Sequence, residues 1–267
     1  MGIDTKSLKN RIKSVDSTLH LTKAMGLVAS AKIRSATNAM TKSRQYANAM
    51  QTTIDMLSSS RVCEKSEYMK SGKENNICLI VIAGDRGLAG GYNSNIFKMT
   101  EQIDFNEIYP IGKRATERYK KDIIKAEGYS YSQAIELAKK LCNDFKEGKY
   151  EKVGIVSTKY TSMMVQEPQI TWIMPLEKKD INSKTDIIFE PDEKTILEAL
   201  IEEYVASKIL ETVRESFTCE VVARRFAMDS AGKNASEMIE NLTLEYNRAR
   251  QGSITQEITE IVAGSGM

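Results

Sequence analysis

A glycine-rich segment is the first place in this sequence where the residues and their spacing could support chemistry. It reads Gly84-Asp-Arg-Gly-Leu-Ala-Gly-Gly91, and it lies between an apolar run at 77–83 and a helical pattern from Ser94. In α/β proteins, the backbone N–H groups of such a turn can bind phosphate. However, the segment lacks a Gly-Lys-Ser/Thr ending, and its glycine spacing differs from that of dinucleotide-binding loops, so nucleotide binding is weakly supported. The alternative is a tight turn in which Asp85 and Arg86 act as local hydrogen-bonding groups. In this interpretation the glycines of the turn, Gly87, Gly90 and Gly91, allow the strand and the helix to pack closely.

The other reactive residue types are sparse or scattered. His20 is the single histidine and is flanked by leucines, so histidine-based metal or triad chemistry is not expected. The cysteines are far apart, with no CxxC pair, which is typical of reduced thiols in an intracellular protein; they are Cys63, Cys78, Cys142 and Cys219. We therefore expect no catalytic residue, no cofactor and no metal site in this chain.

Charge is distributed unevenly along the 267 residues. Residues 1–58 carry nine Lys/Arg against three Asp/Glu, whereas residues 192–267 carry eight against fourteen. A nucleic-acid-binding protein is expected to be more uniformly basic, so that class is not favoured. Opposite charge on the two ends suggests that they lie against each other.

Both ends of the chain have the apolar spacing of long helices. All four prolines fall between residues 110 and 191, which leaves the ends free of the strongest helix breaker. One apolar stripe starts at Leu8 and continues, with a shift of phase, through Leu21, Met25 and Val28. A more regular stripe runs from Leu210 to Leu242. The narrow stripes predict the seam of an antiparallel coiled coil, with the C-terminal helix spanning about 193–262.

The middle of the chain alternates between strand and helix patterns. The predicted strands are 77–83, 107–111, 153–157, 170–174 and 187–189, and the predicted helices start near residues 94, 113 and 131. This alternation predicts a central Rossmann-like α/β domain with a largely parallel sheet. The predicted division is an N-terminal coiled-coil helix at 1–58, a linker at 59–76, the α/β domain at 77–191 and a C-terminal coiled-coil helix at 192–267. No apolar run is long enough to span a membrane.

Several of these segments resemble the gamma subunit of F-type ATP synthases. The N-terminal stretches 8–15, 21–25 and 28–32 look like the opening of that family, and 85–95 resembles its internal motif. Residues 242–251 and 254–262 resemble its C-terminal signature, and Phe189-Glu-Pro191 is similar to its entry into the last helix. The motifs occur in the family's order, on the elements already predicted.

The resemblance implies a rotor shaft without an active site of its own. It implies a coiled coil inside a hexamer of alpha and beta subunits, with the α/β domain contacting the epsilon subunit and the ring of c subunits. Ion flow would turn the ring and the shaft, driving ATP synthesis or hydrolysis in the hexamer. The implied location is peripheral, on the cytoplasmic face of a bacterial cell membrane. Residue by residue, the implied beta-subunit contacts are Met25, Arg250, Gln251, Thr255, Gln256 and Glu257.

Two other functions compete with the shaft. A non-rotary coiled-coil adaptor with an α/β head would explain the helices, and a phosphate-handling enzyme would use the 84–91 loop. The chain also departs from the family pattern at Gly26, Ala89, Arg225 and Gly232. A glycine inside a helix costs up to about 1 kcal/mol relative to alanine, so Gly26 and Gly232 are expected to soften the shaft.

Overall fold

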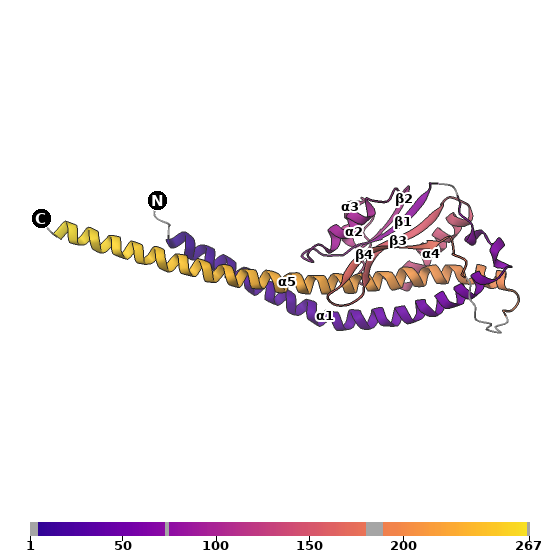
Figure 1. Cartoon of the computed structure of the whole chain (residues 1–267), viewed down its shortest axis with the longest axis horizontal. Coiled ribbons are helices and arrows are strands. Elements are labelled where there is room, and N and C mark those ends of the chain that lie inside the picture. Colours follow the sequence, from indigo (N-terminus) through magenta and orange to yellow (C-terminus); the bar gives the residue numbers. More distant parts are fainter. Residues whose placement is uncertain (1–4, 73–74, 180–188, 266–267) are drawn as a thin grey trace. The chain divides into compact units, whose positions relative to one another are not determined.

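Two long helices dominate the computed structural model, which describes residues 5–72, 75–179 and 189–265 (Figure 1). Helix α1 spans Thr5–Ser59 and helix α5 spans Glu193–Ser265 without a break. Both helices were expected within a few residues of these bounds. The described chain forms two compact units, one of residues 1–30 and 224–267 and one of residues 31–223, so each long helix contributes to both units. The four-part division made from the sequence stays a prediction.

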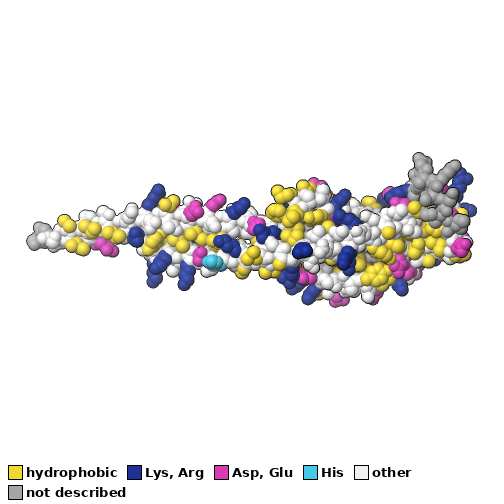
Figure 2. All heavy atoms as spheres, turned by 90° about the horizontal axis from the view of Figure 1, so that it is seen from below, with side chains coloured by type: hydrophobic (Ala, Val, Ile, Leu, Met, Phe, Trp, Pro, Cys, Tyr) yellow, Lys and Arg dark blue, Asp and Glu magenta, His cyan; other side chains and the backbone are white. Residues whose placement is uncertain are grey.

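In the first unit, the two helices pack as an antiparallel pair. An added Cβ on Gly26 would lie 3.7 Å from Met228 Cβ, and one on Gly232 would lie 3.6 Å from Thr22 Oγ1. As residue numbers fall along α1 they rise along α5, which defines the antiparallel direction. Hydrophobic side chains follow the contact and charged ones lie to either side of it (Figure 2).

The predicted shift of phase along α1 is wrong. Leu21 and Val28 are 60% and 56% exposed. The buried stripe instead keeps its original spacing through Thr22, Gly26 and Ala29. These residues are small, so they let the two helix backbones approach without a large apolar side chain at the contact. An apolar pattern alone therefore assigned this stretch of α1 to the wrong face.

The second unit contains a four-stranded sheet in the order β2-β1-β3-β4. The strands are β1 at Ile77–Ile82, β2 at Glu107–Ile111, β3 at Lys152–Tyr160 and β4 at Gln166–Met174. Strand β1 is parallel to β2 and β3, whereas β4 is antiparallel to β3. Both outer strands of this described sheet carry a proline, Pro110 in β2 and Pro168 in β4. The fold class and the largely parallel sheet are confirmed.

One predicted strand is not confirmed. Of the segment 187–189, residues 187 and 188 lie outside the described residues, and Phe189 is not in a strand.

Three short helices cover the sheet, and their positions agree with the sequence patterns to within a turn. They are α2 at Tyr92–Thr100, α3 at Lys113–Arg118 and α4 at Tyr131–Lys146. Successive residues of β1 point to opposite faces, so Ile80 packs in a core with α4 and Leu79 in a core with α2. A capping box formed by Ser130 and Gln133 starts α4.

The polar segment after α1 contributes to the core. It forms two 3-10 turns, Cys63–Lys65 and Glu67–Met69, and buries Cys63 and Tyr68 against Leu57 and its neighbours. All four cysteines are free and buried, and burial raises the pKa of each thiol. The thiols are therefore kept protonated and unreactive at neutral pH.

In the second unit, α5 is covered on nearly every face. Between residues 204 and 222 the buried positions lie on all sides of the helix, because α1 packs on one side and the α/β domain on another. Opposite charges join the helices here: Arg44 Nη2 of α1 lies 2.6 Å from Glu215 Oε1, and Arg44 Nε lies 3.8 Å from Glu211 Oε1. The expectation that the two ends lie against each other is confirmed, but a simple two-helix seam does not describe this part of α5.

We expect Gly26→Ala and Gly232→Ala each to raise the free energy of unfolding by about 1 kcal/mol. The added methyl group would make ordinary van der Waals contacts at 3.6–3.8 Å, while the helix loses a flexible residue. Denaturant unfolding of the purified chain measures the change. Gly112→Ala is the matched control and should destabilise, because its φ is +96° and a Cβ would lie 1.9 Å from the Ala83 carbonyl oxygen. Destabilisation by Gly26→Ala would contradict the packing described for the first unit.

We expect the effect of Glu211→Gln on the free energy of unfolding to become more favourable as the pH rises from 5 to 8. Burial, followed by the neighbouring Glu215 carboxylate, raises the pKa of Glu211. A carboxyl whose folded-state pKa is raised favours folding most below its unfolded pKa, and this contribution is lost as the pH rises through the folded pKa. Glutamine avoids that loss. Thermal unfolding across this pH range measures the difference, and Glu198→Gln, an exposed change on the same helix, is the control.

Candidate functional site

The glycine-rich loop after β1 binds a carboxylate of the chain itself. The backbone N–H groups of Asp85 and Arg86 donate to the two carboxylate oxygens of Glu220, on α5, at 3.2 Å each. Glu220 is 1% exposed. These are two of the N–H groups that a phosphate-binding loop would offer to its ligand. The Glu220 carboxylate is therefore bound by backbone donors of the kind that a phosphate-binding loop offers.

Glycine at position 84 is required by this close approach. An added Cβ there would lie 2.7 Å from Glu220 Cδ. The N–H of Gly84 donates to Asn93 Oδ1 at 2.8 Å, which ties the loop to α2. Further along the loop, Gly90 has a φ of +58°, and Gly91 is the N-cap residue of α2. Gly87 lies between Gly84 and Gly90, and an added Cβ there would be 3.3 Å from the Arg114 side chain.

The Asp85 carboxylate organises the other side of the loop. Its Oδ1 accepts hydrogen bonds from the N–H groups of Lys113 at 3.0 Å and Ala126 at 2.9 Å, and its Oδ2 accepts one from Glu127 at 2.7 Å. Arg86 is exposed, with Nη2 3.4 Å from Glu127 Oε2. These contacts agree with the prediction that Asp85 and Arg86 act as local hydrogen-bonding groups.

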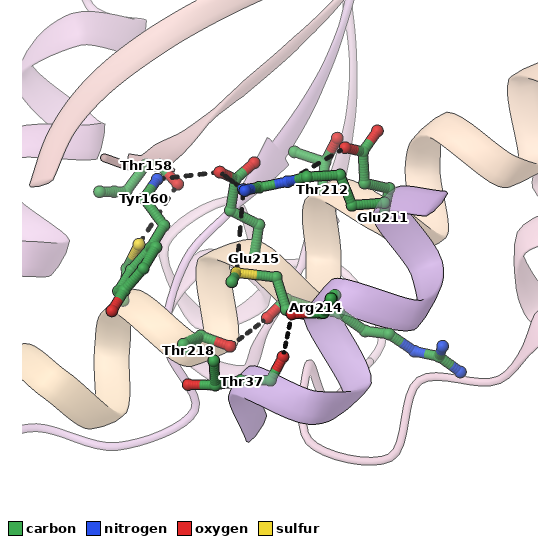
Figure 3. Close-up of polar contacts among 12 residues, drawn as sticks. Thr37, Thr158, Tyr160, Glu211, Thr212, Arg214, Glu215 and Thr218 are labelled. Carbon is green, nitrogen blue, oxygen red and sulfur yellow. Dashed lines mark hydrogen bonds and ion pairs between the residues drawn. The ribbon is translucent and has the colours of Figure 1, made fainter. Parts of the chain in front are cut away.

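Neighbouring residues of α5 contact the same domain. Glu215 Oε1, which pairs with Arg44, also accepts a hydrogen bond from the Tyr160 N–H at 2.9 Å (Figure 3). The buried Tyr92 hydroxyl donates to the Ser216 carbonyl oxygen at 2.8 Å, and the Cys219 thiol to the Thr158 carbonyl oxygen at 3.6 Å. The loop is thus part of a longer contact between α5 and the α/β domain.

Sequence reasoning did not identify Glu220, Glu215 or Tyr92. A signal was present, because Glu215 and Glu220 lie in an otherwise apolar or small stretch of α5 at 215–222. Carboxylates in such surroundings are buried only when they are paired or hydrogen-bonded. The sequence alone could not say which distant N–H groups would supply the bonds.

The predicted C-terminal contact residues lie together on the last turns of α5. All residues from 250 to 265 are exposed, in the first unit. The Gln256 amide donates to Glu260 Oε1 at 3.0 Å, and the Thr255 hydroxyl donates to the Gln251 carbonyl oxygen at 2.9 Å. In the part of the chain that the structure describes, no ion pair holds the Arg250 guanidinium in place.

The same helix end exposes large apolar side chains. Ile254, Ile258, Ile261 and Val262 are between 47% and 70% exposed and follow helical spacing. Met25, the remaining predicted contact, is half-buried on α1 in the same unit. An apolar stripe beside polar side chains is typical of a surface that contacts another protein. The structure thus gathers the five C-terminal residues on one helix end, and the Asp85–Gly91 group on a separate loop.

Among residues 5–72, 75–179 and 189–265, no group of His, Cys, Asp or Glu side chains has an arrangement suited to a metal ion. Within the same ranges, no helix is both long and apolar enough to cross a membrane.

Known structures share this fold. A chain of the mitochondrial ATP synthase of Euglena gracilis, in an OSCP/F1/c-ring assembly, matches with a TM-score of 0.68 at 15% identity, over 98% of this chain and 93% of its own. A chain from the central stalk and c-ring of the Tetrahymena thermophila mitochondrial ATP synthase matches with a TM-score of 0.60 at 18% identity, over 79% and 99%. At these identities the likeness establishes the fold.

Two proteins found by sequence comparison have a higher sequence identity to this chain than these solved structures have. The ATP synthase gamma chain of Ruminococcus albus is 41% identical over 97% of both chains, and that of Moorella thermoacetica is 35% identical over 97% of both. A family model described as ATP synthase matches residues 4–266. The chain therefore belongs to the family of ATP synthase gamma chains.

Proposed function

We propose that this chain is the central rotor shaft of an F-type ATP synthase, coupling ion flow through a membrane c-ring to ATP synthesis or hydrolysis. The observation that carries the proposal is the match to gamma chains along almost the whole sequence. The antiparallel helices and the α/β domain agree with it. The same match favours the shaft over a non-rotary adaptor, which would leave the similarity unexplained.

The partners follow from that role. The helix pair would lie within a hexamer of alpha and beta subunits, and the α/β domain would contact the epsilon subunit and the c-ring. Solved structures similar to this chain come from assemblies described as containing F1, the central stalk or the c-ring. The chain would be peripheral to the membrane, on the cytoplasmic face of a bacterial cell.

The chain would contribute to catalysis without an active site of its own. In its loop after β1, the backbone N–H groups of Asp85 and Arg86 already donate to the Glu220 carboxylate, which argues against the phosphate-handling enzyme. Nucleotide chemistry would take place in the hexamer. The rotor would act by the surface that it presents to each beta subunit in turn.

The contacts with the beta subunits would come from Met25 and from the exposed end of α5. Arg250 supplies forked donors suited to carboxylates, and Gln251 supplies an amide beside it. A charge-assisted hydrogen bond is worth roughly 1.5–3 kcal/mol, which is weak enough to break as the shaft turns. The polar cluster Thr255, Gln256 and Glu257 would make similar contacts one turn further on.

Affinity purification tests the function directly. When the chain is tagged in its native cells, we expect it to recover alpha and beta subunits at one copy to three of each. Calorimetry with ATP should give no heat with the chain alone, because the Glu220 carboxylate already occupies the loop. Recovery of the intact chain without alpha and beta subunits would contradict the shaft, and stoichiometric ATP binding would favour an enzyme.

The double variant Arg250→Ala, Gln251→Ala tests the proposed beta-subunit contacts. We expect the complex to assemble and its ATPase and synthesis rates to fall several-fold, since polar contacts at the helix end are lost while packing elsewhere is unchanged. Rates are measured in membrane vesicles, with assembly checked by the recovery of alpha and beta subunits. Lys233→Ala, an exposed cation earlier on α5, is the control. Unchanged rates in the double variant would remove both residues from the site.

A further inference from the structure

A ten-residue segment of α5, residues 211–220, connects the helix pair to the α/β domain within the second unit. We propose that this segment, called the joint from here on, is where torque passes between the α/β domain and the helices. The proposal rests on the proposed function, because it assumes that the chain rotates. It assigns a role to Glu215 and Glu220, which lie outside the sequence motifs, and to Tyr92, which lies within the internal motif at 85–95.

The strongest connection is between Glu220 and the loop after β1. A carboxylate that accepts two N–H bonds fixes the direction of both donors, and the 1% exposure of Glu220 keeps water from replacing them. Asp85 then carries the connection onward, since its carboxylate binds the N–H groups at the start of α3 and at residues 126–127. A rotation of α5 would therefore pull on several segments of the domain at once.

The second connection joins three elements at one carboxylate. Glu215 of α5 accepts from the Tyr160 N–H at the end of β3 and pairs with Arg44 of α1, as Figure 3 shows in part. Because Arg44 also lies near Glu211, the two long helices are held together at the level where the sheet is attached. The two long helices and the sheet, which is attached to them at the end of β3, would thus rotate as one body.

The remaining connections extend the joint around the helix. The Ser216 carbonyl oxygen accepts a hydrogen bond from the Tyr92 hydroxyl of α2. The Cys219 thiol donates to the Thr158 carbonyl oxygen of β3. Each residue of a helix is rotated by about 100° from the one before it. Roughly half of the circumference of α5 is therefore covered by the bonded positions, which are 211, 215, 216, 219 and 220. Hydrogen bonds are directional, whereas apolar packing is not, so bonds on several sides resist rotation about the helix axis better than packing alone.

The test compares Glu220→Gln with Glu117→Gln in the complete ATP synthase. Glutamine has one acceptor oxygen, and its NH2 group would face a backbone N–H, so one of the two bonds is lost. Glu117 is exposed on α3, and it forms ion pairs with Lys113 and Arg114 of the same helix. In inverted membrane vesicles, we expect protons pumped per ATP hydrolysed to fall at least twofold in Glu220→Gln and to match wild type in Glu117→Gln.

Hydrogen exchange measured on the same complexes shows whether the joint itself has changed. The amides of Asp85 and Arg86 should exchange at least tenfold faster in Glu220→Gln than in wild type. Tyr92→Phe is a milder variant, because it removes only the hydroxyl of α2 that donates to Ser216 of the joint. It should also lower the number of protons pumped per ATP hydrolysed. A defect in folding or assembly alone would reduce the amount of complex without changing the ratio.

The outcomes separate this inference from the proposed function. If wild-type vesicles pump protons and Glu220→Gln pumps with an unchanged ratio while its loop amides exchange faster, the joint does not carry torque. If Glu220→Gln fails to assemble, an unchanged ratio in Tyr92→Phe would overturn the proposal in the same way. A wild-type chain that is absent from any ion-pumping complex would instead overturn the proposed function.

Discussion

The burial of charged groups on α5 is the constraint on which the second unit depends. From residue 204 to residue 222 this helix is enclosed by α1 and by the α/β domain, yet it carries Glu215 and Glu220 in that enclosed stretch. A buried carboxylate without partners is prohibitively costly, so each must find N–H groups or a cation. The partners lie on α1, on β3 and on the loop after β1, and satisfying them sets the register of all three against α5.

The same constraint explains a Rossmann-like domain whose glycine-rich loop binds no nucleotide in the proposed role. A turn between a parallel strand and a helix presents backbone N–H groups in a concave arrangement that suits any anion. Here the anion is Glu220. The loop binds a side chain of the same polypeptide, so the glycines at 84 and 90 are explained by packing and backbone conformation rather than by phosphate.

Much of the fold could be predicted from the sequence because it depends on local patterns. Apolar runs located β1 to β4, and proline-free ends located α1 and α5. The errors arose where tertiary packing overrode hydrophobicity, as at Leu21, which is exposed while Thr22 faces the partner helix. The role of Glu220 was also out of reach, because its partners lie more than a hundred residues away in sequence. The assignment of Arg250 and its neighbours came from resemblance, and it stays a prediction.

The prolines in the outer strands have a consequence for the chain before it is assembled. The outer strand of a sheet exposes a row of unpaired backbone N–H and C=O groups. Two such strands from different molecules can form hydrogen bonds with each other, which leads to aggregation. Pro110 interrupts that row in β2 and Pro168 interrupts it in β4, since neither has an amide hydrogen to share. Newly made copies are thereby discouraged from adding strand to strand with one another, which favours their survival as single chains until they meet the other subunits.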